Sequence, residues 1–149
     1  MKICRLMVGI VVLCVVGQAT AQEKGYWNAT SNTARSITGD LSFAPDKITI
    51  NFTTFALAQI RTLKPDEQQA LFPDVGAGAG NLYRVQIPGD KKFLRKNTLC
   101  GSDETDWIVT WVSAKTLHVA MFSGGSIPTL TPDALASNQR LCGTYMYSR

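Results

Sequence analysis

The sequence predicts a mainly β fold, either a small antiparallel β-barrel or a sandwich, with one or two short helices and one disulfide. Three observations support this prediction. Apolar residues recur at every second position in several short segments, turn-forming residues separate those segments, and only two cysteines follow residue 21. A barrel of about eight strands has an interior that is either filled by side chains or able to hold one small ligand.

The first 21 residues have the pattern of a secretory signal peptide. Lys2 and Arg5 precede an apolar run, 6–16, and Ala19-Thr20-Ala21 matches a small-x-small cleavage site. The apolar run is shorter than the roughly 20 residues that span a bilayer. We therefore expect a leader at 1–21 and one β-rich domain at 22–149, located in the periplasm or secreted.

Charge gives little indication of a nucleic-acid partner. The chain has 15 basic and 11 acidic residues, a net charge of +4 and a pI near 9.0. Lys2 and Arg5 belong to the leader, so 13 basic residues remain against 11 acidic ones and the net charge falls to +2. We expect no nucleic-acid binding and, because no later run is long and apolar enough, no membrane span after cleavage.

The segment "SITGDLSFAPDKITINF" predicts the first β-hairpin, with one face buried and a turn at 44–47. Its alternating positions are Ile37, Gly39, Leu41 and Phe43, followed by Ile48, Ile50 and Phe52.

Later segments predict two more hairpins and a final strand. In "NLYRVQIPGDKKFLRKN", Leu82, Val85 and Ile87 lead into a turn at 88–90, which starts the second hairpin. The β-branched and aromatic runs 107–112 and 116–122 predict the third. The closing "RLCGTYMYSR" is typical of a strand, which gives at least seven strands.

Two segments predict short helices, and one predicts a loop. "LKPDEQQALF" has Pro65 near a helix start and acids in the first turn, and in "TPDALASN" Thr131 and Pro132 suit the N-cap and the first helical position. Gly76, Gly78 and Gly80 predict a flexible loop without the residues of a phosphate-binding motif.

Cys100 and Cys142 are the two cysteines left after cleavage, and they predict one disulfide. Closing a loop of about 43 residues stabilises a fold by about 4 kcal/mol on the chain-entropy model. Two cysteines and one histidine do not assemble a zinc site, so we expect no metal and no cofactor.

Catalytic patterns are not evident in the sequence. His118 is the only histidine, in "TLHVAMF", and we expect it on the solvent face of a strand or hydrogen-bonded there rather than as a base. No serine lies in a nucleophile-elbow pattern, and no carboxylate pair has a spacing typical of acid/base catalysis. The prediction is therefore no catalytic residues and no enzyme activity.

Two groups of side chains are candidate binding residues. The first is basic and could meet an acidic partner, an anionic lipid surface or a polyanionic envelope polymer, but a solvated hairpin turn is favoured over these: Lys91, Lys92, Arg95 and Lys96. The second is aromatic: Trp107 and Trp111 share one strand face, where core packing is favoured over a stacking platform for a flat ligand.

The order of "SITGDLSF", "KITINF", "LCGSDETDWIV", "LHVAMFSGG" and "LCGTYMY" resembles small exported proteins of proteobacteria to which no activity is assigned. The resemblance spans nearly all of 22–149 and implies a Gram-negative periplasmic or secreted β-rich domain. Likeness to lipocalin-like barrels and periplasmic lysozyme-inhibitor barrels is architectural.

Together these patterns predict a non-enzymatic, exported binding barrel that recognises a small apolar ligand or an envelope component. The alternative is a protein-interaction module, an inhibitor or accessory subunit, whose basic hairpin meets an acidic envelope protein or polymer. A hydrolase is the third hypothesis.

Overall fold

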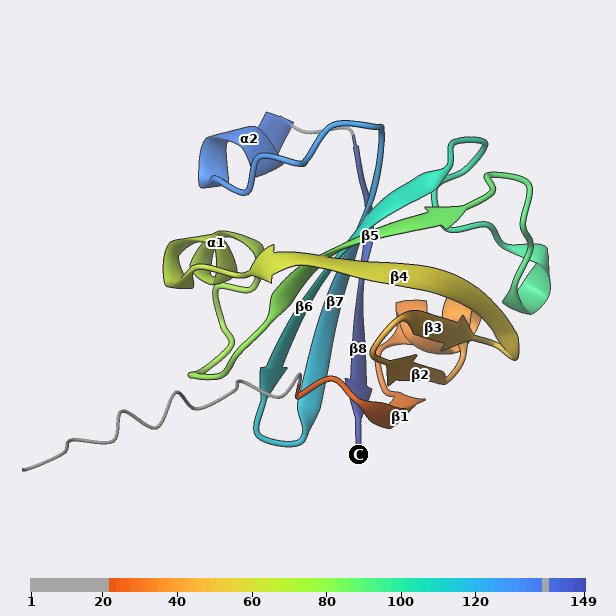
Figure 1. Ribbon diagram of the computed structural model, residues 1–149, viewed down its shortest axis with the longest axis horizontal. Helices are drawn as coiled ribbons and strands as arrows, with labels where there is room; N and C mark the ends of the chain where they lie inside the picture. The colour runs from red at the N-terminus through yellow and green to blue at the C-terminus, as the bar shows by residue number, and fades with distance from the viewer. Residues whose placement is uncertain (1–21, 138–139) are drawn as a thin grey trace, which may run out of the picture.

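The computed structural model describes residues 22–137 and 140–149. Eight strands form a closed antiparallel barrel, in which each strand pairs with its neighbours in the chain and the last pairs with the first (Figure 1). This confirms the predicted fold class as a barrel and not a sandwich. The strands are β1 Gly25–Ala29, β2 Leu41–Ala44, β3 Lys47–Ile50, β4 Thr53–Thr62, β5 Asn81–Ile87, β6 Thr105–Ser113, β7 Thr116–Ser123 and β8 Leu141–Ser148.

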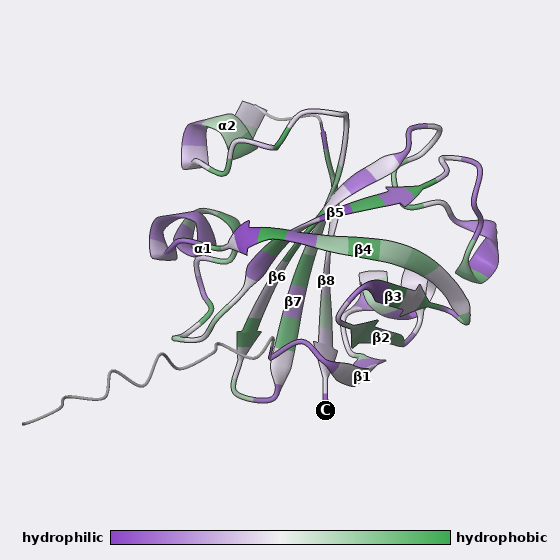
Figure 2. Ribbon diagram, viewed as in Figure 1, coloured by the Kyte–Doolittle hydropathy of each residue, from purple (hydrophilic) through white to green (hydrophobic). Residues whose placement is uncertain are grey.

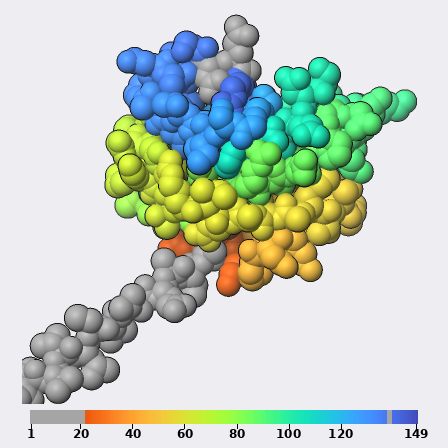
Figure 3. All heavy atoms as spheres, turned by 45° about the horizontal axis from the view of Figure 1, so that its top comes forward, coloured from red at the N-terminus to blue at the C-terminus, as the bar shows by residue number. Residues whose placement is uncertain are grey.

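Short helices decorate the barrel: the π-helix η1 Ala34–Thr38, α1 Pro65–Leu71, the 3-10 helix η2 Leu94–Lys96 and α2 Pro132–Ser137. The predicted α1 and α2 are confirmed, and they lie side by side at one edge of the molecule (Figures 1 and 3). The Glu67 carboxylate accepts the N–H of Lys64 at 2.9 Å and so caps α1. In α2 the hydroxyl of Thr131 accepts the N–H of Ala134 at 3.3 Å. None of the helices in 22–137 and 140–149 has the length and apolar character of a membrane span.

Large apolar side chains fill the barrel interior. Alternate residues of each strand point inward, as the period-two pattern requires, and form one continuous cluster. Trp27, Ile48 and Leu117 in this cluster are fully buried. Other members are Leu41, Phe43, Ile50, Leu57, Tyr83, Val85, Ile87, Ile108, Val112, Val119, Met121, Tyr145 and Tyr147.

A second core lies on the outer face of the sheet. β6 is buried on both faces except at its last residue, because α1, α2 and their flanking loops cover the outer side of β5–β7. Figure 2 shows hydrophobic residues along β6 and β7 and hydrophilic ones on the exposed side of α1. Leu63, Phe72 and Leu130 supply the covering side chains. The outer core explains why residues 107–112 of β6 form an apolar run that only Thr110 interrupts.

The first predicted hairpin is correct in its middle, where β2 and β3 form, and wrong at its two ends. β2 begins at Leu41, and Ile37 lies in η1, which ends where the Gly39 N–H bonds to the Ala34 carbonyl at 2.8 Å. Gly39 adopts φ 63°, which a strand residue does not. Phe52, expected on the buried face, lies in the turn between β3 and β4.

The second predicted hairpin has only its first strand. β5 is confirmed, but residues 91–97 form no strand, because the chain turns back on itself and the Phe93 N–H bonds to the Asn97 carbonyl at 2.8 Å. The connection 88–104 instead covers the end of the barrel that follows Ile87, where Phe93 and Leu99 join the inner core.

β1 and β4 are absent from the predicted hairpins.

The predicted flexibility of the loop that contains Gly76, Gly78 and Gly80 is wrong. Ala79 pairs with Val112 of β6 through two backbone hydrogen bonds. A Cβ on Gly78 or Gly80 would lie 1.9 Å from a β6 carbonyl oxygen, so only glycine permits this close approach. The loop is therefore fixed against the sheet and is not flexible there.

Candidate functional site

Two tight turns carry residues in the left-handed backbone conformation. Asn51 (φ 43°) and Phe52 (φ 65°) connect β3 to β4, and Arg95 (φ 54°) and Lys96 (φ 61°) form the turn within η2. This conformation costs most residues about 1–2 kcal/mol, although Asn tolerates it. Phe52, Arg95 and Lys96 therefore hold strained positions.

Phe52 is also the most exposed large apolar side chain in the described chain, at 98%. The Ile50–Thr53 pair of the β3–β4 ladder flanks the two-residue turn, so the ring projects from a rigid hairpin. The alternation in "KITINF" continues to Phe52. The prediction that Phe52 is buried is wrong because the pattern does not reveal where the strand ends and the turn begins.

The basic candidates divide into two groups. Lys91 is partly buried with its ammonium 5.9 Å from the centre of the Phe93 ring, whereas Lys92, Arg95 and Lys96 are exposed. The two ion pairs between described residues, Arg61–Glu67 and Arg84–Asp106, lie outside this segment. The exposed cations are thus available to a partner, on a tight turn and not on the predicted hairpin.

The two strained turns lie next to each other. A Cβ on Gly39 would be 3.1 Å from Leu94 Cδ1 and 3.9 Å from Asn51 Oδ1, so Gly39 touches both turns. The Asn97 side-chain amide donates to the Ser36 carbonyl at 3.2 Å, which joins η2 to η1. We use the name turn surface for the exposed side chains on and beside these two turns: Tyr26, Arg35, Phe52, Arg95 and Lys96.

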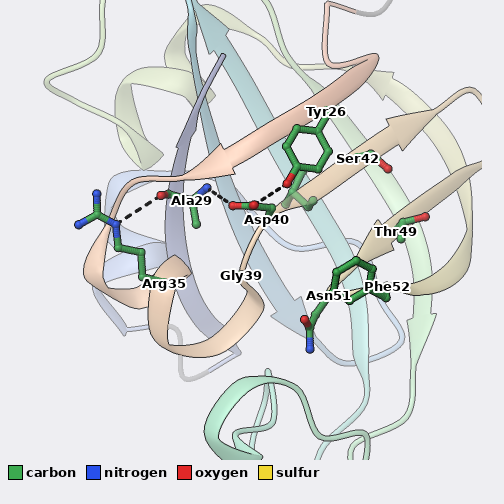
Figure 4. A pocket seen from close by; sticks show the side chains of 10 residues that line it. Tyr26, Ala29, Arg35, Gly39, Asp40, Ser42, Thr49, Asn51 and Phe52 are labelled. Carbon is green, nitrogen blue, oxygen red and sulfur yellow. Dashed lines mark hydrogen bonds between the residues drawn. The ribbon is translucent and has the colours of Figure 1, made fainter.

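A groove of about 350 Å³ runs between Tyr26 and Phe52 over β1, β2 and β3 (Figure 4). Asp40 forms part of its wall and accepts hydrogen bonds from the Tyr26 hydroxyl at 2.5 Å and the Ala29 N–H at 2.8 Å. The hydrogen bond to Asp40 raises the pKa of Tyr26 above its usual value. Both carboxylate oxygens of Asp40 thus accept hydrogen bonds from groups within the protein.

Arg35 extends the positive charge to the rim of this groove. It is exposed, and its Nε donates to the Ala29 carbonyl at 3.4 Å (Figure 4). The groove therefore offers two aromatic rings and a guanidinium. This chemistry suits an acidic, partly apolar segment of another molecule.

Trp107 and Trp111 lie in the outer core, as the favoured packing interpretation expects. Their exposed fractions are 5% and 6%, and their indole N–H groups donate to the carbonyls of Gly124 at 2.7 Å and Gly76 at 3.1 Å. Arg84 stacks on Trp107 at 4.8 Å. Other residues of the protein cover both rings, which therefore do not form part of the turn surface.

His118 lies on the outer face of β7, as predicted, where it lines a second groove of about 280 Å³. Its ring centre is 5.5 Å from that of Phe72, and burial there lowers the pKa of His118 below its usual value. Ser31 lines the same groove, but its hydroxyl accepts the N–H groups of Ala34 and Met146, each at 3.1 Å. Ser31 therefore acts as a structural cap.

The disulfide joins Cys100 to Cys142, as predicted. Cys100 lies in the connection 88–104, which contains η2, and Cys142 lies in β8. The bond therefore fastens this connection to the wall of the barrel. The bond thereby supports the basic part of the turn surface.

Sequence reasoning found Arg95 and Lys96 but missed Phe52, Tyr26 and Arg35 as site residues. Asn51 before Phe52 is a turn signal that would have placed the hairpin correctly. The contact between the two turns depends on η1, which no sequence pattern predicts. Comparison with family models, curated proteins and solved structures finds no significant match to this chain.

Proposed function

We propose that this protein is a non-enzymatic, exported binding module whose turn surface recognises an acidic protein of the cell envelope. Export is supported by the leader-like pattern of residues 1–21 and by a disulfide, which is typical of oxidising compartments. The observation that carries the binding role is Phe52, a 98% exposed aromatic ring on a strained turn. This turn packs next to the turn that carries the exposed Arg95 and Lys96.

The energetics of Phe52 favour a binding role over a folding role. A phenyl ring in solvent contributes no burial, and its positive φ costs about 1–2 kcal/mol. Glycine at the same position would relieve this cost. A residue that weakens its own fold in this way is better explained by an external contact, and buried aromatic anchors dominate the energy of many protein interfaces.

Charge indicates what kind of partner fits. Arg35 shares the groove with Phe52, and Arg95 and Lys96 lie on the neighbouring turn. None of these cations belongs to the two ion pairs within 22–137 and 140–149. An acidic surface with an apolar pocket would complement both features, since it would accept Phe52 and pair with the cations. The groove beside Tyr26 is large enough for a side chain of that partner.

The filled interior makes the cargo form of the hypothesis less attractive. Trp27, Tyr147 and Phe43 occupy the space in which a small ligand would lie in an open barrel. We therefore place recognition on the surface and commit to an envelope protein as the partner. The groove at His118 gives no comparable support to the hydrolase hypothesis, because Ser31 is held as a cap.

The test is site-specific photocrosslinking in the envelope of the organism that encodes the protein. A photoreactive phenylalanine analogue at position 52 should give one discrete protein adduct. The same analogue at Ile60, which is 44% exposed on β4, is the matched control and should not give that adduct. Adducts to lipid or polysaccharide at position 52, or equal adducts at both positions, would contradict an acidic protein partner.

Neutralisation of the cations tests the charge component separately. Arg35→Gln, Arg95→Gln and Lys96→Gln together should weaken the captured interaction at least tenfold at low salt and less at high salt. Lys115→Gln, at the exposed turn between β6 and β7, removes a charge away from the turn surface and should have little effect. Equal affinity of the triple variant and the wild type would show that these cations do not contribute to partner binding.

A further inference from the structure

A buried carboxylate lies close to the predicted cleavage site. Glu23 is 1% exposed, and its Oε1 accepts hydrogen bonds from the Thr110 hydroxyl at 2.5 Å and the Asn81 side-chain amide at 2.8 Å. Its Oε2 is equally buried but has no hydrogen-bond partner. A buried carboxylate oxygen without a partner is costly and calls for an explanation.

The backbone around Glu23 is held in place by three hydrogen bonds. Arg149 donates to the carbonyls of Gln22 at 3.1 Å and Lys24 at 2.9 Å, and the Trp27 indole donates to the carbonyl of Glu23 at 2.7 Å. The Arg149 guanidinium also stacks over Trp27 at 4.3 Å. The last residue of the chain therefore fixes the first residues of the domain, so a group attached at Gln22 has a defined place.

The charge of Glu23 is not balanced by an ion pair between described residues. Arg149, the nearest cation by these contacts, bonds to backbone carbonyls, and neither described ion pair includes Glu23. The hydroxyl of Tyr83 lies near the same carboxylate: burial, the charge of Glu23 and a hydrogen-bonding interaction with Glu23 all raise the pKa of Tyr83. Tyr83 is a neutral donor and leaves the charge of Glu23 without a counterion. The missing component at Oε2 is a cation or a hydrogen-bond donor that reaches the end of the barrel where β5 begins.

Cleavage after Ala21 would create such a cation one residue away. Gln22 would then begin the chain with a primary α-amine, which is an ammonium at neutral pH. Gln22 is exposed while Glu23 is buried, so the new amine would lie at the surface beside the buried carboxylate. Because the ammonium is tethered next to Glu23 on a fixed backbone, little entropy is lost when the two groups pair.

We infer that the α-ammonium of Gln22, released by cleavage after Ala21, is the partner of Glu23 Oε2 and completes the packing of the processed domain. The inference rests on the proposed export and cleavage. Its chemistry is simple: hydrolysis of the 21–22 peptide bond converts an amide N–H into an ammonium with three donors. The ion pair then satisfies the orphan oxygen and ties the new N-terminus to β5 and β6.

The test compares chains with defined N-termini that are made in vitro, so it does not depend on export. A fusion removed by a protease that leaves no extra residue gives a chain beginning at Gln22, and a second chain begins at Ala19. The extension should lower the melting temperature by about 5–10 °C in the wild type. In Glu23→Gln the extension should have almost no effect, because no charge is left to pair. An equal effect of the extension in both backgrounds, or none in either, would overturn the inference.

A second readout does not depend on stability. N-terminal glutamine loses ammonia to form pyroglutamate, and glutaminyl cyclase accelerates this reaction on a free amine. Pairing with Glu23 should protect the amine, so cyclisation in the folded wild type should be about tenfold slower than in Glu23→Gln. Lys24→Gln, which removes an exposed neighbouring charge, should behave as the wild type. Equal cyclisation rates in the wild type and Glu23→Gln would contradict the pairing even if the melting temperatures agreed with it.

Failure of the Gln22–Glu23 ion pair and failure of the export hypothesis give different results. If the ion pair does not form, the N-terminal extension changes the wild type and Glu23→Gln to the same extent in vitro. If the export proposal is wrong, intact-mass analysis of the protein from its own organism finds no chain that begins at Gln22, whatever the defined chains show.

Discussion

The hydroxyl groups of Thr38 and Tyr147 lie 2.6 Å apart in the buried interior of the barrel. Thr38 ends η1 and Tyr147 belongs to β8, so this bond joins the irregular segment beneath the turn surface to the last strand. Burial raises the pKa of Tyr147 far above its usual value, which keeps the hydroxyl neutral. The contact helps to place η1, and η1 in turn places Arg35.

Tyr147→Phe removes this hydrogen bond with little change in shape. We expect the free energy of unfolding to fall by about 1 kcal/mol, the usual value for a neutral buried bond, because Thr38 keeps its bond to the Ala34 carbonyl. Urea unfolding measures the change. Tyr145→Phe is the matched control: this ring is also buried but has no hydrogen bond between described residues, and it should cost less. Equal costs would mean that the Thr38 contact adds nothing.

Loss of the disulfide should destabilise the protein and loosen η2 together. Replacing Cys100 and Cys142 by serine should lower the free energy of unfolding by about 2–4 kcal/mol. Amide hydrogen exchange should also rise in 88–104 more than in β6 and β7, because the bond fastens that connection to β8. A reductant should destabilise the wild type and leave the double variant unchanged. Uniform exchange along the chain would contradict a local role.

The strands that the sequence predicts are those with clean alternation or with β-branched and aromatic runs. In β7, Leu117, Val119 and Met121 face the interior, and the pattern alone locates them. β4 was missed because Phe55 and Leu57 alternate with alanine and a bulge at Gln59 then breaks the period. Local spacing cannot distinguish such a strand from a helix.

The site was less predictable than the fold because it depends on contacts between distant segments. Asn51 and Leu94 meet at Gly39 only when η1 and the connection 88–104 pack together. The basic run and the disulfide were visible in the sequence, whereas their place beside Phe52 was not. Patterns with a period of two locate faces and not the turns at which faces end.

The ion pair at the start of α1 should make stability depend on pH in the acid range. Arg61 donates to both carboxylate oxygens of Glu67, at 2.7 and 2.6 Å, and this hydrogen bonding lowers the pKa of Glu67. A lowered folded-state pKa adds stability above the unfolded value of about 4.3, and that stability is lost as the pH falls through the folded value. Arg61 is partly exposed, so the expected size is below about 1 kcal/mol.

Glu67→Gln tests this dependence. The variant should be less stable than the wild type at pH 7, and the two should converge as the pH falls below about 4. Thermal unfolding across this range measures the difference. Glu104→Gln, an exposed acid on the connection 88–104, should follow the wild type at every pH. A constant difference between Glu67→Gln and the wild type down to the lowest pH would show that the lost cap, and not the charge, is responsible.

His118 should titrate below its usual pKa of about 6.5, because burial against Phe72 disfavours the charged ring. The folded state then binds fewer protons than the unfolded state near pH 6. The stability due to neutral His118 is therefore present above about pH 6.5 and is lost as the pH falls toward the folded pKa. An NMR titration of the single imidazole measures this value directly. Phe72→Ala should raise it toward 6.5, and an unchanged value would assign the shift to some other cause.

Phe52 provides the sharpest test of a conflict between folding and binding. Phe52→Gly creates Asn-Gly, the preferred pair for a two-residue hairpin turn with positive φ at both positions. We expect the free energy of unfolding to rise by about 1 kcal/mol, because strain is relieved and no buried surface is lost. The photocrosslinked partner of position 52 should at the same time bind at least tenfold more weakly, since the aromatic anchor is gone.

The matched control is Ala114→Gly in the turn between β6 and β7. Ala114 also has a positive φ, 52°, and it is exposed at a turn that contributes no residue to the turn surface. This variant should gain a similar stability and keep full affinity for the partner. If Phe52→Gly gained stability and kept affinity as well, the strained ring would have no binding role. If it lost stability, the ring would be contributing to the fold despite its exposure, and backbone strain at position 52 would not be evidence of a binding role.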